Sequence, residues 1–445
     1  MVHQRSAPAL DFGLGPHAHL RVLAGPPVRA QRWSRLGAPR LHPRGFAEGR
    51  GGRGRAGTDS HAQMVVSVPF WLRPDHRKGI AIAGIVVIGG GLAGAATATH
   101  LAQAGRAVVL LERDRTPTSK VCGEFLGPMA CRELAGLGID LTALGAQAIG
   151  QMRLFAGRRS ADARLPFQAS GLSRTILDEK LRGVAAETGV DVRLGVRATE
   201  IARRNVTLNG GGHIAADDVV VATGKHEVRG VVRRSVANQK DAKIGIKEHL
   251  RLAPEPFAEM GKAVELHFFP GGYAGLMPVA DGVANLSIAM ETEVWRREGL
   301  TPATYLDWLR TSVGSLSERL AGADRVFDRP LMVSGVPYGF RLWNAPSDAP
   351  GLWRVGDQAI VTPSLTGEGM SLALGTARCL AECLIEGAPQ STYRDRLRRR
   401  YGRQIAVARA FEVMLERQAL RMPLLTALAM FPGALRTGAT WSRGG

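Results

Sequence analysis

The sequence predicts an α/β fold, α+β overall, with a Rossmann-like domain, a second domain of mostly antiparallel sheet and a helical C-terminal tail. Three observations lead to this prediction. From Ile80 to Asp114 a strand, a glycine turn, a helix and a second strand follow one another. Between Lys243 and Arg341 the strands are longer and alternate in polarity, which is typical of antiparallel sheets. A strand, a loop and a helix return from Leu352, and the chain beyond Ser391 has a helical pattern.

The 445 residues are enough for two or three domains, and the net charge of +19 does not indicate a nucleic-acid-binding module. Residues 1–78 hold thirteen Lys and Arg against four Asp and Glu, so nine of the net positive charges lie there. A second arginine-dense stretch runs from Arg394 to Arg409. Neither stretch has the interleaved aromatic residues of a nucleic-acid binder. We therefore expect no nucleic-acid partner.

The first 78 residues are predicted to be a disordered basic leader, because they are rich in Arg, Gly, Pro and Ala and show no apolar periodicity. They lack the early apolar core and cleavage site of a secretory signal. Two explanations remain. The leader is either an organellar transit peptide or an upstream extension of the reading frame with Met64 as the true start, and we favour the second.

The four cysteines are too few and too scattered for a disulfide framework or a zinc site. We therefore expect a cytoplasmic protein without a metal, and Cys379 and Cys383 buried as small apolar residues. No apolar run reaches the roughly 18 residues of a membrane-spanning helix. The arginine-dense helix and the segment 422–435 are expected to pack on the body, with peripheral contact to a membrane surface as the alternative.

The stretch VVIGGGLAGA contains a G-x-G-x-x-G motif at Gly89, Gly91 and Gly94, between a predicted strand and a predicted helix. In this context the glycines allow a tight turn, close approach of a pyrophosphate, and packing of the helix on the strand. Glu112 ends the next strand, twenty-three residues after Gly89, where an acid binds ribose hydroxyls. This acid disfavours a 2′-phosphate, so NAD and FAD both remain possible.

A second segment, WRVGDQAIVTPSLTGEGMSLALGTA, begins at Trp353 and selects FAD. Here a strand ends at Gly356 and Asp357, and a proline loop leads to the helix that follows Gly367 and Gly369. Asp357 can bind a ribitol hydroxyl, and the helix N-terminus can face the flavin edge where negative charge gathers on reduction. A simple NAD dehydrogenase has no use for such a segment so far from the first.

These two motifs resemble those of the flavoprotein superfamily of geranylgeranyl reductase and para-hydroxybenzoate hydroxylase, with its glutathione-reductase-type FAD domain. SKVCGEFLGPMACRELAGLG and SRTILDEKL resemble further segments of the reductase branch. The resemblance covers Ile80 to about Gly387. It implies an FAD site made of Gly89, Gly91, Gly94, Glu112, Arg113, Arg174, Gly224, Gly356, Asp357, Pro363, Gly367, Gly369 and Met370.

The same resemblance places Cys122 near the flavin, with a packed thiol as the alternative. Glu124 is the second candidate catalytic residue, which either donates a proton or pairs with a neighbouring base. His267, Phe269 and Tyr273, on the expected antiparallel sheet, are candidates for an apolar substrate pocket. The chain has no second G-x-G-x-x-G motif. We therefore expect NAD(P)H or another electron carrier to visit the flavin transiently rather than to occupy its own domain.

The predicted domains divide the chain into interleaved segments. The FAD-binding domain takes 80–150, 173–230 and 347–388, the substrate domain 151–172 and 231–346, and the C-terminal helical region 389–445. The predicted function is an FAD-dependent oxidoreductase that reduces a C=C bond, or carries out another redox step, on a hydrophobic isoprenoid- or polyketide-like substrate. The alternatives are an FAD-dependent aromatic monooxygenase and, more remotely, a non-enzymatic basic binding protein.

Overall fold

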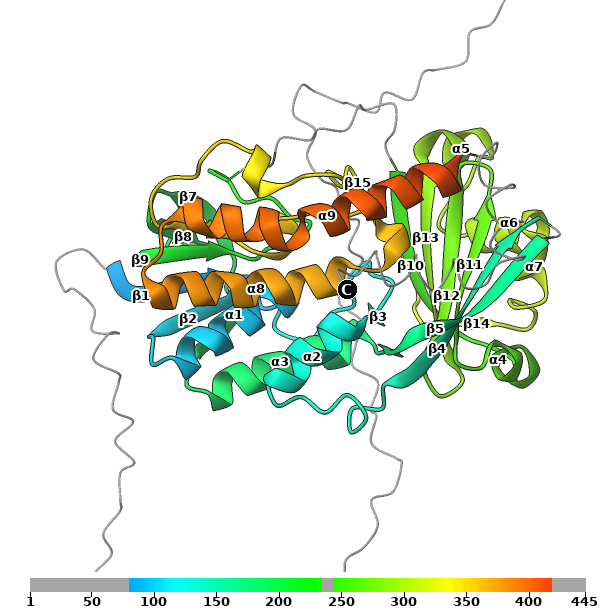
Figure 1. Cartoon of the computed structure of the whole chain (residues 1–445), viewed down its shortest axis with the longest axis horizontal. Coiled ribbons are helices and arrows are strands. Elements are labelled where there is room, and N and C mark those ends of the chain that lie inside the picture. The colour runs from blue at the N-terminus through cyan, green and yellow to red at the C-terminus, as the bar shows by residue number, and fades with distance from the viewer. Residues whose placement is uncertain (1–79, 158, 232, 234–242, 418–445) are drawn as a thin grey trace, which may run out of the picture.

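The computed structural model describes residues 80–157, 159–231, 233 and 243–417, and the strands among them form two sheets (Figure 1). The predicted leader, with Met64, and the segment 418–445 lie outside the described residues. The first sheet has strand order β6-β2-β1-β9-β8-β7, with β16 paired to β9. The second sheet has order β14-β10-β13-β12-β11-β4-β5-β3, with β15 paired to β10. The two sheets and their helices confirm the predicted α/β class.

The first sheet is parallel in its centre and ends in an antiparallel hairpin. Alternate side chains of its central strand enter two different cores, because Ile85 and Val87 face one side and Val86 and Ile88 the other. This double burial is typical of parallel strands covered on both faces. Its strands are β1 (Ile80–Ile88), β2 (Val108–Glu112), β6 (Asp191–Leu194), β7 (Ala198–Ala202), β8 (Asn205–Leu208), β9 (His213–Val221) and β16 (Leu352–Arg354).

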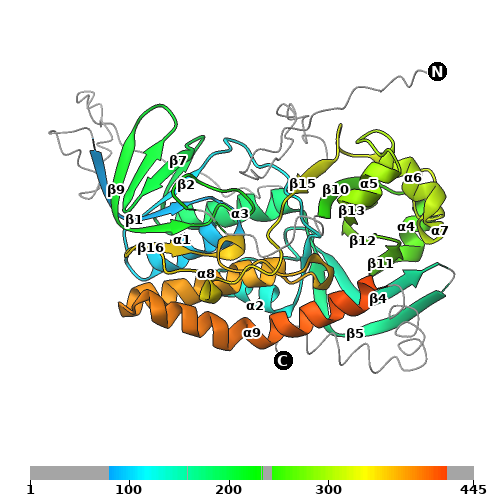
Figure 2. The same cartoon turned by 90° about the horizontal axis from the view of Figure 1, so that it is seen from above.

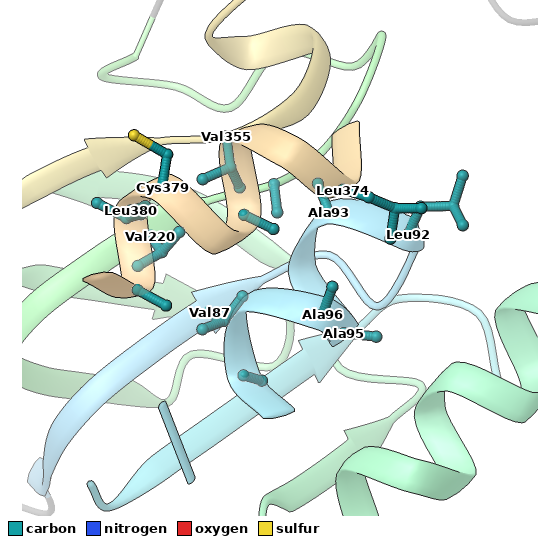
Figure 3. Close-up of a cluster of buried hydrophobic side chains, with 14 of the residues drawn as sticks. Val87, Leu92, Ala93, Ala95, Ala96, Val220, Val355, Leu374, Cys379 and Leu380 are labelled. Carbon is teal, nitrogen blue, oxygen red and sulfur yellow. The ribbon is translucent and has the colours of Figure 1, made fainter. Parts of the chain in front are cut away.

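Helices α1 (Leu92–Gln103), α3 (Arg174–Glu187) and α8 (Gly369–Glu386) contribute to the core on one side of this sheet. Small residues of α1, among them Ala93 and Ala96, let α8 approach closely, and Figure 3 shows both helices over Val87 and Val220. Cys379 and Cys383 lie in this core with 0% exposure, which confirms the prediction that they are buried.

The second sheet is antiparallel apart from the pairing of β11 with β4, which is parallel. Its strands are β3 (Phe125–Leu126), β4 (Gln147–Ala156), β5 (Arg159–Gly171), β10 (Lys243–Arg251), β11 (Ala263–Phe269), β12 (Gly272–Ala280), β13 (Val283–Glu291), β14 (Asp324–Arg325) and β15 (Leu331–Ser334). Core residues from α5 (Thr292–Arg297), α6 (Tyr305–Ser312) and α7 (Gly314–Ser317) pack on one face, and α4 (Pro254–Met260) contributes Met260. Helices α6 and α7 interrupt the strands of this sheet between β13 and β14.

Two further helices pack outside the helices named so far. Helix α2 (Pro128–Gly136) packs beside α8, and α9 (Gln390–Glu416) runs from the first sheet to the second (Figure 2). The ring of Tyr393, near the start of α9, packs against Trp353 of β16, and Leu415, near its end, packs among residues of the second sheet. Helix α9 therefore bridges the two sheets. Short 3-10 helices occupy the loops: η3 (Leu342–Asn344), η4 (Gly356–Gln358) and η5 (Ser364–Thr366).

The stretch IARRNVTLN is predicted from the sequence to be one short strand, but the structure has two strands there. Ala202 pairs with Asn205, so Arg203 and Arg204 form the tight turn between β7 and β8. Arg203 has φ +57°, a conformation that usually favours glycine or asparagine. The prediction of a single strand was wrong because this turn carries none of the usual turn residues.

Candidate active site

The first glycine turn lies between the end of β1 and the start of α1, and it leaves no room for side chains. Gly89 has φ +109°, and a Cβ on Gly94 would lie 1.8 Å from the carbonyl oxygen of Gly89. Gly91 is the N-cap of α1, and no described side chain caps this helix. The first N–H groups of α1 and the positive end of its dipole therefore suit a phosphate group.

Glu112 lies at the end of β2, directly beside this turn. Its side chain is buried, with Oε2 accepting a hydrogen bond of 2.7 Å from the N–H of Gly90 and Oε1 one of 3.0 Å from that of Asp114. Arg182 donates from α3 to the carbonyl oxygen of Gly90, at 3.2 Å. The acid and the turn are thus held in one unit, with the carboxylate where a ribose next to the pyrophosphate would meet it.

The second motif follows β16 and reaches the same end of the first sheet. Gly356 has φ +60°, and a Cβ there would lie 2.9 Å from Cβ of Ala93 in α1. Gln358 donates from Nε2 to the carbonyl oxygens of Gly224 and His226, at 2.9 and 2.8 Å, which ties this motif to the loop after β9. The predicted residues of both motifs and Gly224 therefore come together, although more than 240 residues of chain separate Glu112 from Asp357.

The loop from Pro363 to the start of α8 closes the other side of this region. Gly367 has φ +68°, and a Cβ there would lie 3.2 Å from the ring of Phe125. Helix α8 starts at Gly369 without a capping side chain among the described residues, and Met370 is buried in its first turn. Ser371 Oγ, in the same turn, is buried and has no hydrogen-bond partner among the described residues. Uncapped N–H groups and an unpaired hydroxyl fit the polar edge of a bound flavin.

Arg113 and the loop after β9 form a basic rim beside Glu112. Nη2 of Arg113 lies 2.9 Å from Nε2 of His226, and Lys120 is paired with Asp114 at 2.9 Å. Burial and the cations Arg113 and Lys120 lower the pKa of His226 to about 4, so its ring is neutral at neutral pH. Lys225 lies 3.4 Å from Oδ2 of Asp357. The rim therefore reaches Asp357, the residue predicted to bind ribitol, through Lys225. Its other cations, Arg113 and Lys120, are partly exposed.

Cys122 lies on a turn of residues 120–124, named here the Cys122 turn. The N–H of Glu124 donates to its sulfur at 3.3 Å, and Asn285 of β13 donates to the carbonyl oxygens of Cys122 and Gly123, at 3.2 and 2.8 Å. Burial lowers the pKa of the Arg174 guanidinium, but Asp178 and the contact with Cys122 raise it above its usual value. Arg174 also approaches the phosphate turn, because its Nη2 would lie 3.5 Å from a Cβ on Gly91.

Glu124 is fully buried at the end of this turn. Its carboxylate is paired with Nζ of Lys247 and, at 2.6 Å, with Nε2 of His249, and it accepts a hydrogen bond of 2.7 Å from the N–H of Arg174. Burial raises the pKa of Glu124, but Lys247 and His249 lower it by more, so that the resulting pKa is about 2. Glu124 is therefore ionised at neutral pH and engaged at both oxygens, which fits the alternative of pairing with neighbouring bases and does not suit proton donation.

The three predicted pocket residues lie on opposite faces of the second sheet. His267 bonds to Ser315 Oγ at 2.8 Å and stacks on Phe155, and Phe269 packs with the helices on that side. Tyr273 faces the other way and packs in a cluster with Leu154, Phe268, Leu365 and Leu415. Tyr273 alone lies on the side that meets the loop before α8.

Four further residues of this region were not predicted from the sequence: Lys247, His249, Asn285 and Lys225. A signal for the first two was present in the strand KIGIKEHLR, where Ile244, Ile246 and Leu250 enter the helix-covered core. Lys247 and His249 must then share the opposite face, since strand side chains alternate. A lysine and a histidine facing inward on a buried strand predict an acidic partner, and the sequence could not say that Glu124 is that partner.

Comparison with known proteins gives the same cofactor. Residues 84–175 match the family described as FAD dependent oxidoreductase. The menaquinone reductase of Mycolicibacterium smegmatis is 27% identical over 372 residues, which cover 75% of this chain and 84% of that protein. Digeranylgeranylglycerophospholipid reductase 1 of Methanopyrus kandleri is 28% identical, over 71% of this chain and 84% of its own.

Two solved structures share the fold. A geranylgeranyl bacteriochlorophyll reductase-like protein of Thermoplasma acidophilum superposes with a TM-score of 0.65 at 19% identity, over 78% of this chain and 91% of its own. A flavin-dependent brominase superposes with a TM-score of 0.68 at 15% identity, over 80% and 93%.

The two-part cofactor site and the matched family define the class of this protein: it is an FAD-dependent oxidoreductase, as its motifs predicted. The menaquinone and digeranylgeranylglycerophospholipid reductases are its sequence relatives, which confirms the resemblance to the geranylgeranyl reductase superfamily. Of the helices that the structure describes, none has the length and apolarity needed to cross a bilayer. The described residues also contain no cluster of three or more His, Cys, Asp and Glu side chains suited to a metal ion.

Proposed function

We propose that this enzyme reduces a C=C bond of a lipid that carries isoprenoid units. The observation that carries the proposal is the position of the Cys122 turn. The second sheet holds it at Asn285, and its last residue, Glu124, accepts from the N–H of Arg174 beside the phosphate turn. The names of the two reductase relatives denote lipids with isoprenoid chains, which supports the same substrate class.

The chain's own residues would hold the cofactor as follows. The turn from Gly89 to Gly94 and the start of α1 would bind the pyrophosphate, and Glu112 the adenosine ribose. Asp357 would bind the ribitol, and Gly367, Gly369 and Met370 would line the flavin ring. Once bound, FAD supplies the two-electron chemistry. Cys122 would then lie beside the ring, with Arg174 fixing its orientation.

The substrate would lie beside the buried apolar cluster on one side of the second sheet, which Leu415 of α9 helps to cover. Tyr273 and Phe268 lie there with Leu154 and Ala289, next to Leu365 of the loop before α8. Apolar side chains at the edge of a flavin site suit an isoprenoid unit, since burial of each CH₂ contributes about 0.8 kcal/mol. His267 and Phe269, on the opposite face, would support the sheet rather than contact the substrate.

For the reductant we propose NAD(P)H or another anionic electron carrier, which would dock transiently on the basic rim. Arg113 and Lys120 keep 40% and 29% of their side chains exposed there. Guanidinium and ammonium groups suit phosphate oxygens. Stopped-flow reduction of the bound flavin by NADH and NADPH, with Arg113→Ala beside the parent, tests this. Unchanged reduction rates in the variant would exclude the rim.

We also propose a cytoplasmic location, because the four cysteines are all free thiols, with contact to a membrane surface through α9. Arg396, Arg399 and Arg400 line one open surface of this helix. Flotation with anionic and neutral vesicles, using an Arg399→Glu variant as the comparison, tests the contact. Equal binding of the parent to both kinds of vesicle would contradict it.

An aromatic monooxygenase is the second candidate function, and the shared fold with a flavin-dependent brominase favours it, since that enzyme is an oxidative flavoenzyme. Product mass separates the two functions. Anaerobic turnover of a menaquinone with a product heavier by two mass units supports the reductase. Substrate-dependent oxygen uptake with a product heavier by sixteen supports the monooxygenase.

A further inference from the structure

Glu124 has an unusual combination of burial, charge and backbone conformation. Its side chain and that of Lys247 are both 0% exposed, and its φ is +59°. A non-glycine residue in this conformation costs of the order of 1 kcal/mol or more, and persists where its surroundings determine it. The carboxylate accepts from three donors in two different parts of the fold, which are β10 and the start of α3.

These donors hold the Cys122 turn from both sides. Lys247 and His249 belong to β10, which is hydrogen bonded to β13, the strand that carries Asn285. Asn285 itself donates to the backbone of Cys122 and Gly123. The second sheet therefore contacts the turn both at its backbone and at the side chain of Glu124. The N–H of Arg174, at the start of α3, contacts the carboxylate of Glu124 as well.

The ion pair is fully buried and packs against an aromatic ring. The ring of His249 stacks on Phe327 with centroids 4.8 Å apart, and Nζ of Lys247 lies 6.0 Å from the centre of the same ring. Because both side chains are fully buried, loss of the carboxylate charge would leave a buried lysine cation uncompensated. A variant that removes the charges of both Glu124 and Lys247 therefore disrupts their contact without leaving a single buried charge.

We infer that Glu124 is a positioning residue, which with Lys247 and His249 fixes the Cys122 thiol against Arg174 and couples the second sheet to the cofactor site. Glu124 does not touch the reacting atoms. Its action is exerted through the backbone N–H that it donates to the sulfur and through the turn between the two residues. The catalytic meaning of this inference rests on the proposed function, but the position of the thiol does not.

The test measures the thiol and needs no substrate. The holoenzyme and a Glu124→Gln/Lys247→Met variant, which removes both charges, are treated with iodoacetamide, and alkylation is followed at the peptide that carries Cys122. We expect Cys122 to react at least about tenfold faster in the variant, because its turn is released. Cys131, half-buried on α2 in the same molecule, should react at its parent rate.

Glu248→Gln is the matched control. Glu248 is also 0% exposed and lies on the same strand, but it faces the other side and binds Tyr305. This variant should lose stability and leave Cys122 unchanged. A Cys122 rate within about twofold of the parent, or below it, in a double variant that keeps its FAD would overturn the inference.

A second variant covers the case in which the double variant does not fold. His249→Asn removes one donor and leaves the Glu124–Lys247 pair intact, so a smaller rise in the alkylation rate is expected. The visible circular dichroism of the bound flavin should change in the same variants and stay constant in Glu248→Gln. No change of either signal in folded His249→Asn protein would also overturn the inference. Failure of the proposed isoprenoid reduction would alter neither measurement.

Discussion

The hydroxyl of Tyr273 donates a hydrogen bond of 2.6 Å to Oγ of Ser364. Tyr273 belongs to β12 of the second sheet, and Ser364 begins η5, directly before the glycines that lead into α8. One side-chain contact therefore ties the sheet proposed to hold the substrate to the loop proposed to line the flavin.

Tyr273→Phe should lower both the stability and the flavin affinity. Loss of one partly buried hydrogen bond costs about 1 kcal/mol, and the freed loop would hold FAD less firmly. Urea unfolding and the rate of FAD release, followed by flavin fluorescence, measure the two effects. Tyr305→Phe is the control, because its hydroxyl donates to Glu248 on the helix-covered side of the second sheet, away from the flavin loop. If both variants release FAD equally, the Tyr273 contact has no special part in flavin binding.

Glu112→Ala should weaken FAD binding by about tenfold to a hundredfold, in line with a loss of about 1–3 kcal/mol when buried donors lose their acceptor. The N–H groups of Gly90 and Asp114 would lose that acceptor together with the ribose contact. Titration of the apoprotein with FAD measures the effect. Glu200→Ala removes a half-exposed carboxylate of the same sheet and should bind FAD normally. An FAD affinity in Glu112→Ala equal to that of the parent would show that Glu112 does not bind the cofactor.

Gly94→Ala should abolish FAD binding and destabilise the fold by more than about 3 kcal/mol. The added Cβ would lie 1.8 Å from the backbone oxygen of Gly89, which cannot move without opening the turn. Gly183→Ala is a matched exchange within α3, where no atom lies within 4 Å of the new Cβ. It should stabilise the protein by about 0.5–1 kcal/mol. Thermal melts and the flavin content of both variants decide the comparison.

Acid should destabilise the folded state in part through His226. Its pKa is lowered from 6.5 to about 4 by burial, Arg113 and Lys120, with Asp114 opposing them and Lys225 adding to them. Between these two pKa values the unfolded chain binds more protons, so stability falls as the pH drops through this window. Urea unfolding at both ends of the window should show a shallower pH dependence for His226→Gln. A slope equal to that of the parent in His226→Gln would disprove the assignment.

Residues with a local signature were predictable from the sequence. Gly89, Gly91, Gly94 and Glu112 could be placed because a phosphate turn requires glycine at fixed spacing and an acid at the next strand end. The apolar spacing of RTILDEKLRGVAAETG predicts a helix that begins at Arg174, where the structure has the start of α3. In each case a short stretch of chain determines the geometry, so no distant partner needs to be known.

The rest of the site depends on pairing across the fold. The sequence does not show that Glu124 meets Lys247 and His249, because these residues lie more than 120 positions apart and their contact follows from the docking of two sheets. The failure at Arg203 has another cause. Its turn uses a left-handed backbone at a residue whose side chain gives no sign of it. The positions of His267 and Phe269 depend on which face of β11 the helices cover, which alternation alone leaves open.

The pairing of β16 with β9 has a consequence for how the protein folds during its synthesis. Leu352 pairs with Val219 and Arg354 with Val221, and the intervening chain builds most of the second sheet. A ribosome must therefore release that whole insertion before the first sheet can acquire its last strand. Such distant pairing slows folding and leaves a strand edge exposed to aggregation meanwhile. The flavin pocket is thus completed near the end of folding, and added FAD should raise the yield of refolded protein without accelerating its early phase.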